Sequence, residues 1–464
     1  MARKLDKTKF EPIIISPRSY FVFTPLLAST AVGTLEFRTI LEPVRRLAGV
    51  GFSQGWAEDI DFTNKTVLVE SNAADDPASK TVVPADPAGS PKPKGDIFPI
   101  AYDKLIIACG AYSQTFGIQG VPEHAHFLRD IGDARRLRLR VLSLFEQCSV
   151  PETSPHALSP SDKRTLLHFA IVGGGPTGIE YAAELHDLIY EDLSSIYPDL
   201  LQHVSITVYD VAPKVLPMFD QALAQYAMDT FSRQNIQVKT QHHLQRIRPA
   251  PGHLAPHGAL RIQIEELGPD NEVGAGLVVW STGLMANPLI EKLTSKSFTL
   301  PAIHSSPSPV DSPLPLRKLS KDPRTGSLLT DPFLRAQHSL DGNAVPTPLE
   351  DVFVIGDCGL ISDSPTPLPK TAQVASQQAL HLAKRLNKGD FATKEFKFTN
   401  WGTMTYLGSW KAIHQSSADE LKGWVAWVFW RGAYMTKSMS VRNKILVPVY
   451  WAISWIFGRG ISRF

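Results

Sequence analysis

The stretch from Leu166 to Leu185 constrains the fold of this chain more than any other, because three glycines join a strand pattern to a helix pattern there. It reads L-L-H-F-A-I-V-G-G-G-P-T-G-I-E-Y-A-A-E-L. The apolar run before the glycines predicts a buried strand, and the pattern from Pro176 onward predicts an amphipathic helix. Such a unit is typical of an α/β fold with a parallel sheet.

Gly173, Gly175 and Gly178 have the G-x-G-x-x-G spacing of a dinucleotide-binding turn. The first glycine permits the tight turn, the second lets the backbone approach a pyrophosphate, and the third lets the helix pack closely on the strand. The N–H groups at the helix N-terminus then face the phosphates. A structural glycine turn without a ligand is the alternative.

A second predicted strand, Val204 to Asp210, ends in a carboxylate that suits the adenosine ribose of NADH. The interval from Gly173 exceeds the roughly 20 residues of the compact fingerprint. We expect the polar stretch from Asp187 to Gln202 to extend the crossover helix and account for the excess. An acid rather than an arginine at this strand end favours NADH over NADPH.

Other strand patterns also end on glycine. I-I-A-C-G ends at Gly110 and W-S-T-G ends at Gly283, and this repetition indicates two similar nucleotide-binding units. The run D-V-F-V-I-G-D-C, Asp351 to Cys358, places Gly356 and Asp357 at the carboxyl edge of a sheet. An aspartate there can accept a hydrogen bond from a ribityl hydroxyl, and capping of the following turn is the alternative.

Several connecting segments have interpretable compositions. The aromatic loop from Ser16 to Leu27 suits a flat apolar ligand or, alternatively, a packed core, and Gly33 to Arg46 is expected to be a helix. The small residues of a predicted helix from Pro369 to Ala383 would let its end lie against a flat ring. Residues 71–96 are expected to form a solvated insertion, and residues 301–315 a low-complexity loop.

The last part of the chain changes character. Seven of the nine tryptophans follow residue 400, and no acidic residue follows Glu420. Tryptophan and basic residues favour the membrane–water interface. The apolar run from Ile445 to Phe457 contains Pro448 and is shorter than the roughly 20 residues of a membrane span. We therefore expect this segment to lie in the interface, with a dimer face or a cap over the core as the alternative.

Composition excludes some classes. At 464 residues the chain is too long for one core, so two to three domains are expected. A net charge of +2 gives no nucleic-acid signature. Cys109, Cys148 and Cys358 are far apart in sequence and contain no C-x-x-C, which supports neither a disulfide framework, nor a zinc site, nor a redox dithiol. No metal site and no targeting peptide are predicted.

Together these motifs resemble the type II (non-proton-pumping) NADH:quinone oxidoreductases, specifically the mitochondrial alternative NADH dehydrogenases of fungi. The matching segments run in family order: S-P-R-S-Y-F-V-F-T-P-L-L, I-I-A-C-G-A, V-G-G-G-P-T-G-I-E, W-S-T-G, I-G-D-C, K-T-A-Q-V-A-S-Q-Q-A and Y-L-G-S-W. The resemblance implies an α/β fold of two Rossmann-like nucleotide-binding domains plus a C-terminal amphipathic helical membrane-associated region. The implied domains are residues 1–162 and 287–395 for FAD, 163–286 for NADH, and 396–464 for membrane association and dimerisation.

The resemblance also implies the activity. NADH would give a hydride to FAD, and two electrons would then pass to ubiquinone without proton pumping, in a peripheral homodimer on the inner mitochondrial membrane. By position, Thr24, Pro25, Gly110 and Asp357 would contact FAD, with Ala372 and Gln373 beside the ring, and Gly173, Gly175, Gly178 and Asp210 would hold NADH. Glu180 resembles the family acid near the nicotinamide. Gln373 and Gln377 lie where quinone is expected, and Ser376 stands where some relatives carry histidine.

One departure from the family concerns the FAD pyrophosphate. The family's first strand and its G-x-G-x-x-G loop have no counterpart here, and residues 1–10 resemble the end of the helix that follows them. We expect a gene model that lacks these N-terminal residues. The alternative is a flavin-free NADH-binding membrane protein without catalysis. A soluble disulfide reductase is disfavoured, since it would need a paired-cysteine redox centre.

Overall fold

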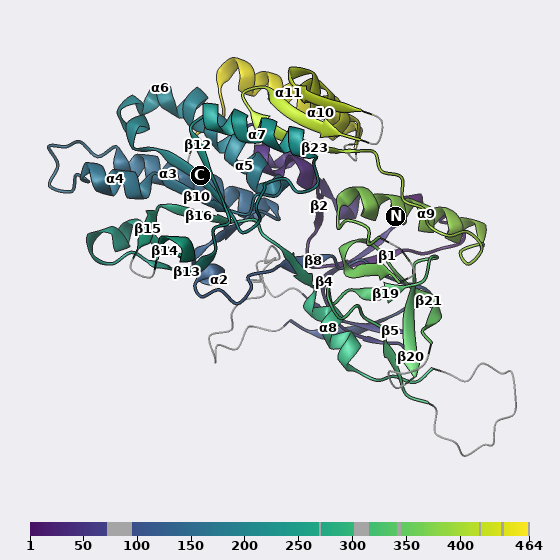
Figure 1. The fold of residues 1–464 in the computed structure, drawn as a ribbon. Coiled ribbons are helices and arrows are strands. Elements are labelled where there is room, and N and C mark those ends of the chain that lie inside the picture. Colours follow the sequence, from purple (N-terminus) through teal and green to yellow (C-terminus); the bar gives the residue numbers. More distant parts are fainter. Residues whose placement is uncertain are drawn as a thin grey trace, which may run out of the picture. The chain divides into compact units, whose positions relative to one another are not determined.

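The computed structural model describes residues 1–71, 95–268, 271–300, 315–340, 345–362, 364, 366–416, 419–437 and 440–462. The chain forms two compact units, each assembled from segments that are distant in sequence (Figure 1). The first unit contains Met1–Tyr20, Pro43–Tyr112 and Leu284–Thr399, and the second contains Phe21–Glu42, Ser113–Gly283 and Asn400–Phe464. The predicted insertion at 71–96 and the predicted loop at 301–315 lie almost entirely outside the described residues.

The second unit is built on a five-stranded parallel sheet in the order β12-β11-β10-β16-β9. Its strands are β9 (His126–Phe127), β10 (His168–Val172), β11 (Ser205–Asp210), β12 (Ile236–Thr240) and β16 (Leu277–Trp280). All five residues of β10 are buried, as expected for a strand covered on both faces. Because β11 lies on one side of β10 and β16 on the other, the strand order reverses at the end of β10. Open α/β sheets bind ligands at such a position.

Helices cover this sheet. The principal ones are α3 (Ile131–Cys148), α4 (Pro160–Leu166), α5 (Pro176–Asp187) and α7 (Gln221–Arg233). The crossover from β10 to β11 does continue beyond α5. It passes through the π-helix η5 (Leu188–Leu193), the short α6 (Ser194–Ile196) and the 3₁₀ helix η6 (Pro198–His203). This helical extension accounts for the long interval between the glycine turn and Asp210.

The second unit also includes the C-terminal segment. An antiparallel sheet of β23 (Thr403–Gly408), β24 (Lys411–Gln415) and β25 (Glu420–Gly423) lies against α5 through β23. The helices α10 (Trp424–Lys437) and α11 (Val441–Phe457), yellow in Figure 1, follow it, and α10 packs on the sheet. Buried side chains from α1 to α11 form one hydrophobic core. The remaining elements of this unit are η2 (Thr24–Leu26), α1 (Leu27–Ala31), η3 (Phe37–Thr39), α2 (Val121–His124), β13 (Leu244–Pro249), η7 (Gly252–His257), β14 (Leu260–Ile264), η8 (Glu265–Leu267) and β15 (Glu272–Ala275).

The first unit contains two larger sheets. In one, β1 (Ile13–Ser16) pairs in parallel with β4 (Gly51–Asp61), followed by antiparallel β5 (Thr66–Ser71) and β6 (Ile97–Ala101). In the other, β21 (Thr347–Val354) pairs in parallel with β7 (Leu105–Ile107). The remaining elements of the first unit are η1 (Ala2–Lys4), η4 (Val44–Arg46), β17 (Leu284–Ala286), α8 (Pro288–Ser295), β18 (Arg317–Leu319), β19 (Leu328–Thr330), β20 (Arg335–Leu340), η9 (Gly356–Cys358), β22 (Gly359–Ile361) and α9 (Ala372–Lys388). The chain passes between the units within β2 (Tyr20–Val22), β3 (Leu41–Pro43) and β8 (Ala111–Ser113), and again after Gly283 and after Thr399.

The prediction of a helix from Gly33 to Arg46 is wrong. The segment instead contains η3, β3 and η4. Gly33 has a φ of +85°, which turns the chain away from a right-handed helix, and Pro43 has no N–H to donate within one. Residues 1–10 contain only the three-residue η1, so they are not the end of a longer α-helix in this structure.

Candidate functional site

The glycine turn after β10 has a backbone geometry that lets a phosphate group approach closely. Gly173 has a φ of +114°, a conformation that L side chains rarely adopt. A Cβ on Gly178 would lie 2.0 Å from the carbonyl oxygen of Gly173, so only glycine lets α5 begin so close to β10. A Cβ on Gly175 would meet no atom within 4 Å, which leaves the backbone there open to an approaching group. The turn therefore combines close packing on one side with an accessible backbone at the N-terminus of α5.

Asp210, at the end of β11, stabilises this turn through hydrogen bonds to its side chain. One carboxylate oxygen accepts a hydrogen bond from the N–H of Gly174, and the other accepts from the N–H of Ala212 at 2.6 Å. A carboxylate offers about four acceptor positions, so Asp210 retains capacity for ribose hydroxyls. At the end of β16, the Ser281 hydroxyl donates to the carbonyl oxygen of Val172 at 3.0 Å. The nearby Gly283 has a φ of +48°.

Glu180 lies on α5, two residues after Gly178, and its side chain is almost completely buried. Its carboxylate accepts a hydrogen bond from the backbone N–H of Tyr406 in β23 at 3.2 Å. Burial raises the pKa of Glu180 to about 8, the Tyr406 hydrogen bond opposes the rise, and the neighbouring Glu184 adds to it. Near neutral pH this side chain can therefore hold or release a proton.

Two further buried carboxylates on α5 were missed from the sequence. The Glu184 carboxylate accepts hydrogen bonds from the hydroxyls of Ser29 at 2.5 Å and Thr34 at 2.9 Å. The Asp187 carboxylate accepts from the Tyr406 hydroxyl at 2.6 Å. The available signal was the i, i+4, i+7 spacing of Glu180, Glu184 and Asp187, which places all three acids on one face of a helix that is otherwise apolar.

In the first unit, Gly356 and Asp357 follow β21, as the sequence predicted for a strand that ends in Gly-Asp. Gly356 has a φ of +75°. Its N–H donates to the Gln378 side-chain oxygen of α9 at 2.7 Å. Gly356, Asp357, Lys370 and Gln378 line a pocket together with the start of α9. Gln378 was not predicted, although it is a polar residue in the buried stripe of α9.

The predicted residues of α9 lie in its first two turns. Thr371 caps the helix, Ala372 is its first residue, and Gln373 is half-buried. The Gln377 amide group donates to the Thr399 carbonyl at 2.8 Å and accepts from the Thr399 N–H at 3.0 Å. Thr24 and Pro25 belong to η2 of the second unit, whereas Gly110 belongs to the first unit. Gly110 has a φ of +70°, and a Cβ there would meet no atom within 4 Å.

These residues suit part of an FAD molecule. A left-handed glycine, a carboxylate and the positive end of a helix meet around the pocket of the first unit, and they provide hydrogen-bonding groups for a ribityl chain and a flavin ring. The sequence contains one G-x-G-x-x-G, at Gly173, in the second unit.

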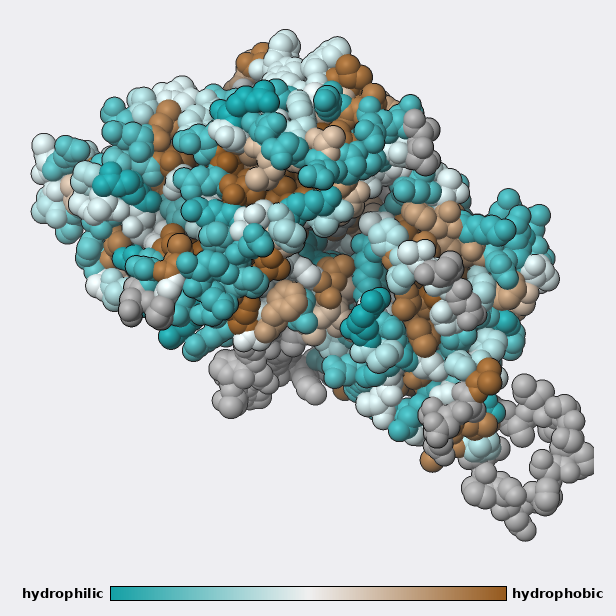
Figure 2. Space-filling view, in the orientation of Figure 1, coloured by the Kyte–Doolittle hydropathy of each residue, from teal (hydrophilic) through white to brown (hydrophobic). Residues whose placement is uncertain are grey.

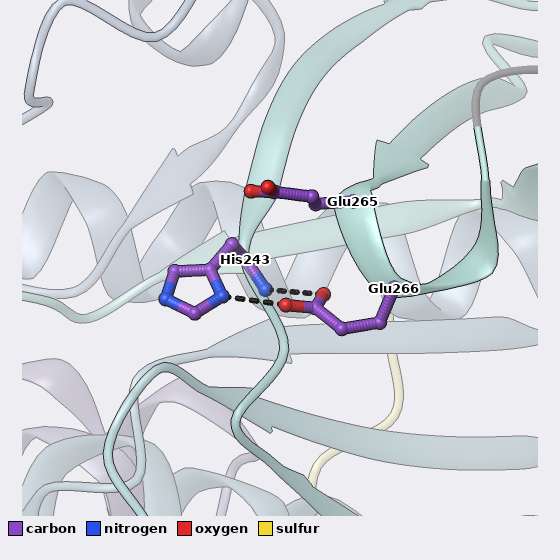
Figure 3. A group of neighbouring side chains, drawn as sticks. All are labelled: His243, Glu265 and Glu266. Carbon is purple, nitrogen blue, oxygen red and sulfur yellow. Dashed lines mark hydrogen bonds and ion pairs between the residues drawn. The ribbon is translucent and has the colours of Figure 1, made fainter.

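One group of side chains in the described part of the chain has the spacing of metal ligands. It consists of His243, Glu265 and Glu266, all three exposed (Figure 3). The His243 ring nitrogen pairs with one Glu266 carboxylate oxygen at 2.5 Å, and the His243 backbone N–H donates to the other at 2.8 Å. The hydrogen bond that the protonated His243 ring donates to the Glu266 carboxylate raises the pKa of His243. A surface ion pair accounts for this geometry.

The C-terminal helices expose an apolar face. It consists of Trp424, Val425, Val428 and Phe429 of α10 and Val441, Ile445, Val449, Ile453, Trp455, Ile456 and Phe457 of α11. In Figure 2 brown, hydrophobic residues are interspersed with white and teal ones at the upper edge of the view, where Figure 1 places α10 and α11. The opposite sides pack inward through Trp430 and Trp451. Among the described residues no helix is long and apolar enough to cross a bilayer.

Comparison with known proteins agrees with this architecture. The family described as pyridine nucleotide-disulphide oxidoreductase matches residues 1–299, and the NDH2 C-terminal domain matches residues 401–460. A probable NADH dehydrogenase of Dictyostelium discoideum is 34% identical over 473 residues, which cover 100% of this chain and 88% of that protein. The mitochondrial external NADH-ubiquinone oxidoreductase 2 of Saccharomyces cerevisiae is 30% identical, with 100% of this chain and 79% of that protein covered.

A solved structure shows the same fold. The structure of NDH2 from Plasmodium falciparum in complex with NADH superposes with a TM-score of 0.78 at 22% identity and covers 99% of this chain and 96% of that one. The fold and the match over residues 1–299 define a pyridine nucleotide-linked oxidoreductase. Within that class, the chain belongs to the type II family of alternative NADH-ubiquinone oxidoreductases. The family and the fold class predicted from the sequence are thus confirmed.

Proposed function

We propose that this protein is an FAD-dependent NADH:ubiquinone oxidoreductase that does not pump protons. The observation that carries the proposal is the turn after β10, whose open backbone at Gly175 and bracing carboxylate at Asp210 suit the pyrophosphate and ribose of NADH. Relatives named as NADH-ubiquinone oxidoreductases share the chain over almost its full length, which supports the same activity here.

The residues act mainly by binding and orientation. Gly173, Gly175 and Gly178 would hold the NADH pyrophosphate at the N-terminus of α5, and Asp210 would accept hydrogen bonds from the ribose. Bound FAD would supply the redox chemistry, which is acceptance of a hydride from NADH and transfer of two electrons to ubiquinone. No general base is needed for hydride transfer. Gly283 is proposed as a further position of close cofactor approach.

A second set of residues is assigned to FAD and quinone. Gly110, Gly356 and Asp357 of the first unit, with Thr24 and Pro25, are proposed to contact FAD, and Ala372 would lie beside its ring. Gln373 and Gln377 are proposed at the quinone. Glu180, whose pKa of about 8 permits proton exchange near neutral pH, is proposed to modulate quinone protonation.

The protein is proposed to act as a peripheral homodimer on the inner mitochondrial membrane. The apolar face of α10 and α11 and the absence of acidic residues after Glu420 support contact with lipid. Matched relatives carry mitochondrial names, which supports the compartment. The division into residues 1–162 and 287–395 for FAD, 163–286 for NADH and 396–464 for the membrane follows ligands rather than packing, and it also stays a proposal.

A flavin-free NADH-binding protein is the second candidate, because the sequence has a single G-x-G-x-x-G. Purified protein separates the two candidates. Visible flavin absorption together with quinone-dependent oxidation of NADH supports the enzyme. A colourless protein that still binds NADH in a fluorescence titration supports the second candidate, and a protein that fails to bind NADH contradicts both.

A further inference from the structure

Two cysteines that are far apart in sequence lie at the ends of neighbouring strands in the first unit. β7 and β21 run in parallel, and Ile107 is paired with Val354. Cys109 follows Ile107 by two residues and Cys358 follows Val354 by four, beyond the same edge of the sheet. Neighbouring strands are about 4.8 Å apart. The two side chains are therefore neighbours, since Cys109 packs against the apolar cluster that contains Cys358, and a hydrogen bond between the thiols raises the pKa of Cys109 and lowers that of Cys358.

The surroundings of the two sulfur atoms differ. The Cys358 side chain is 1% exposed within an apolar cluster, whereas Cys109 packs against that cluster and is only partly buried. The Cys358 thiol lies 3.6 Å from the carbonyl oxygen of Ile107. The hydrogen bond from Cys109 lowers the pKa of Cys358, and the backbone N–H of Gly110 lowers it further, against the opposing effects of burial and of Asp357. Cys109 is thus the more exposed thiol, with a pKa that the hydrogen bond to Cys358 and burial raise well above its ordinary value, and Cys358 is the thiol whose thiolate is stabilised.

We propose that Cys109 and Cys358 form a reversible disulfide when a hydroperoxide, such as hydrogen peroxide, oxidises them. One sulfur–sulfur bond forms and the oxygen–oxygen bond of the peroxide breaks. The two thiols together lose two electrons and two protons, and hydrogen peroxide is reduced to two molecules of water. A dithiol reductant reverses the reaction by thiol–disulfide exchange. The bond would covalently join the turn at Gly110 to the turn at Asp357.

The third cysteine provides an internal control. Cys148 ends α3 in the second unit, where burial raises its pKa to about 12. A thiol with so high a pKa contributes almost no thiolate at neutral pH and reacts slowly with peroxide. Cys148 is therefore expected to remain reduced under conditions that oxidise the pair.

The test uses the full chain without substitutions. The reduced protein, freed of reductant, is treated with hydrogen peroxide and then alkylated with N-ethylmaleimide in denaturant. The mass of the intact chain is expected to show a fall from three alkylated cysteines to one. A proteolytic digest should contain a cross-linked pair of peptides that carry Cys109 and Cys358, and dithiothreitol should separate them.

Variants confirm the partners. Cys148→Ser should leave the cross-link intact, and Cys109→Ser should abolish it. The proposal is overturned if all three cysteines stay alkylatable at a peroxide concentration that oxidises glutathione. It is also overturned if Cys109 or Cys358 is oxidised singly to a sulfinic acid, or if the cross-link includes Cys148. Because the first measurement needs no variant and no flavin, its outcome does not depend on the proposed NADH:ubiquinone activity.

Discussion

At the scale of single residues, the glycines of the nucleotide turn are required for different reasons. Gly178 is required by packing, since any Cβ would collide with the carbonyl oxygen of Gly173. Gly175 has a φ of −75° and open space around its Cα, so the folded chain itself would tolerate a side chain there. A requirement for glycine at position 175 would thus come from a ligand.

A pair of alanine substitutions separates these demands. Gly178→Ala is expected to destabilise the protein by about 2–3 kcal/mol, because the new methyl group forces α5 away from β10. Gly175→Ala should leave the melting temperature unchanged and weaken NADH binding at least about tenfold, which corresponds to roughly 1.4 kcal/mol. Thermal denaturation and NADH titration measure both effects. Unchanged NADH affinity in Gly175→Ala would show that the phosphates of NADH do not bind at this turn.

The pKa of Glu180 makes a prediction about stability and pH. An ordinary glutamate has a pKa of 4.5, whereas burial raises that of Glu180 to about 8. The folded state therefore keeps a proton that the unfolded state has released, and the contribution of Glu180 to stability is lost as pH rises from 4.5 through about 8.

The Glu180→Gln side chain keeps an oxygen that can accept the hydrogen bond from the Tyr406 N–H, but the amide cannot ionise. Between pH 5 and pH 9, its free energy of unfolding is expected to gain on the order of 3–5 kcal/mol relative to the unsubstituted protein. Urea denaturation across this pH range measures the difference. Glu291→Gln, at an exposed position of α8, is the control and should show no such gain. A pH-independent difference for Glu180→Gln would contradict burial of an ionisable carboxyl.

At the scale of elements, α9 shows how a helix positions a turn that belongs to another part of the chain. Its buried stripe carries Val374, Gln378 and Leu382. The Gln378 side-chain oxygen accepts from the N–H of Gly356, while Gln377, the preceding residue, binds the backbone of Thr399 on the exposed side. Adjacent glutamines thus hold two different loops.

Substitution of these neighbours should have unequal effects. Gln378→Leu leaves the Gly356 N–H without its partner and is expected to destabilise the protein by about 1–3 kcal/mol. It should also reduce the flavin retained on purification. Gln377→Leu, on the exposed side, should change the free energy of unfolding by less than about 1 kcal/mol. Denaturant titration compares the two, and equal effects would contradict the role given to Gln378.

The helices α10 and α11 make a prediction about lipid binding. Phe457 is 81% exposed at the end of α11, and Val345 is 85% exposed in the first unit. Phe457→Glu is expected to reduce cosedimentation with vesicles of phosphatidylcholine and phosphatidylglycerol several-fold, because a carboxylate opposes insertion into an anionic interface. Val345→Glu is the matched control and should bind like the unsubstituted protein. Equal binding by both variants would favour a dimer face over a membrane face.

At the scale of the whole molecule, each compact unit is assembled from three separate stretches of chain. In the second unit, the C-terminal segment around Arg459 contacts the N-terminal segment around Thr34. The Arg459 side chain is 9% exposed, pairs with Asp192 at 2.6 Å and donates to the Thr34 hydroxyl at 2.9 Å. One arginine therefore ties the C-terminal segment to the crossover after α5 and to the segment after α1.

Loss of this tie should destabilise the second unit. Arg459→Met leaves Asp192 without its buried partner, and the expected loss is about 3 kcal/mol. Arg442→Met, at an exposed position of the same C-terminal segment, should change stability little. Thermal denaturation with and without NADH measures both variants. Equal melting temperatures would show that the C-terminal segment is not held through Arg459.

The sequence by itself determined the features that depend on neighbouring residues. The strand, the three glycines and the helix around Gly175 follow from local spacing, as do the apolar run from Ile445 to Phe457 and the Gly-Asp end of β21. Their order along the chain was sufficient to predict the family and the fold class. The helix predicted from Gly33 to Arg46 fails where Gly33 and Pro43 interrupt a pattern that is otherwise compatible with a helix.

Only the tertiary structure decided which distant residues meet. Parallel strands need long crossover connections, so residues that adjoin at one sheet edge are separated by many positions in sequence. For this reason no local pattern could show that Cys109 meets Cys358, that Gln378 supports Gly356, or that Tyr406 covers Glu180. The physical consequences of those meetings, a thiol pair and a carboxyl with a raised pKa, depend on burial and contact, which the fold alone creates.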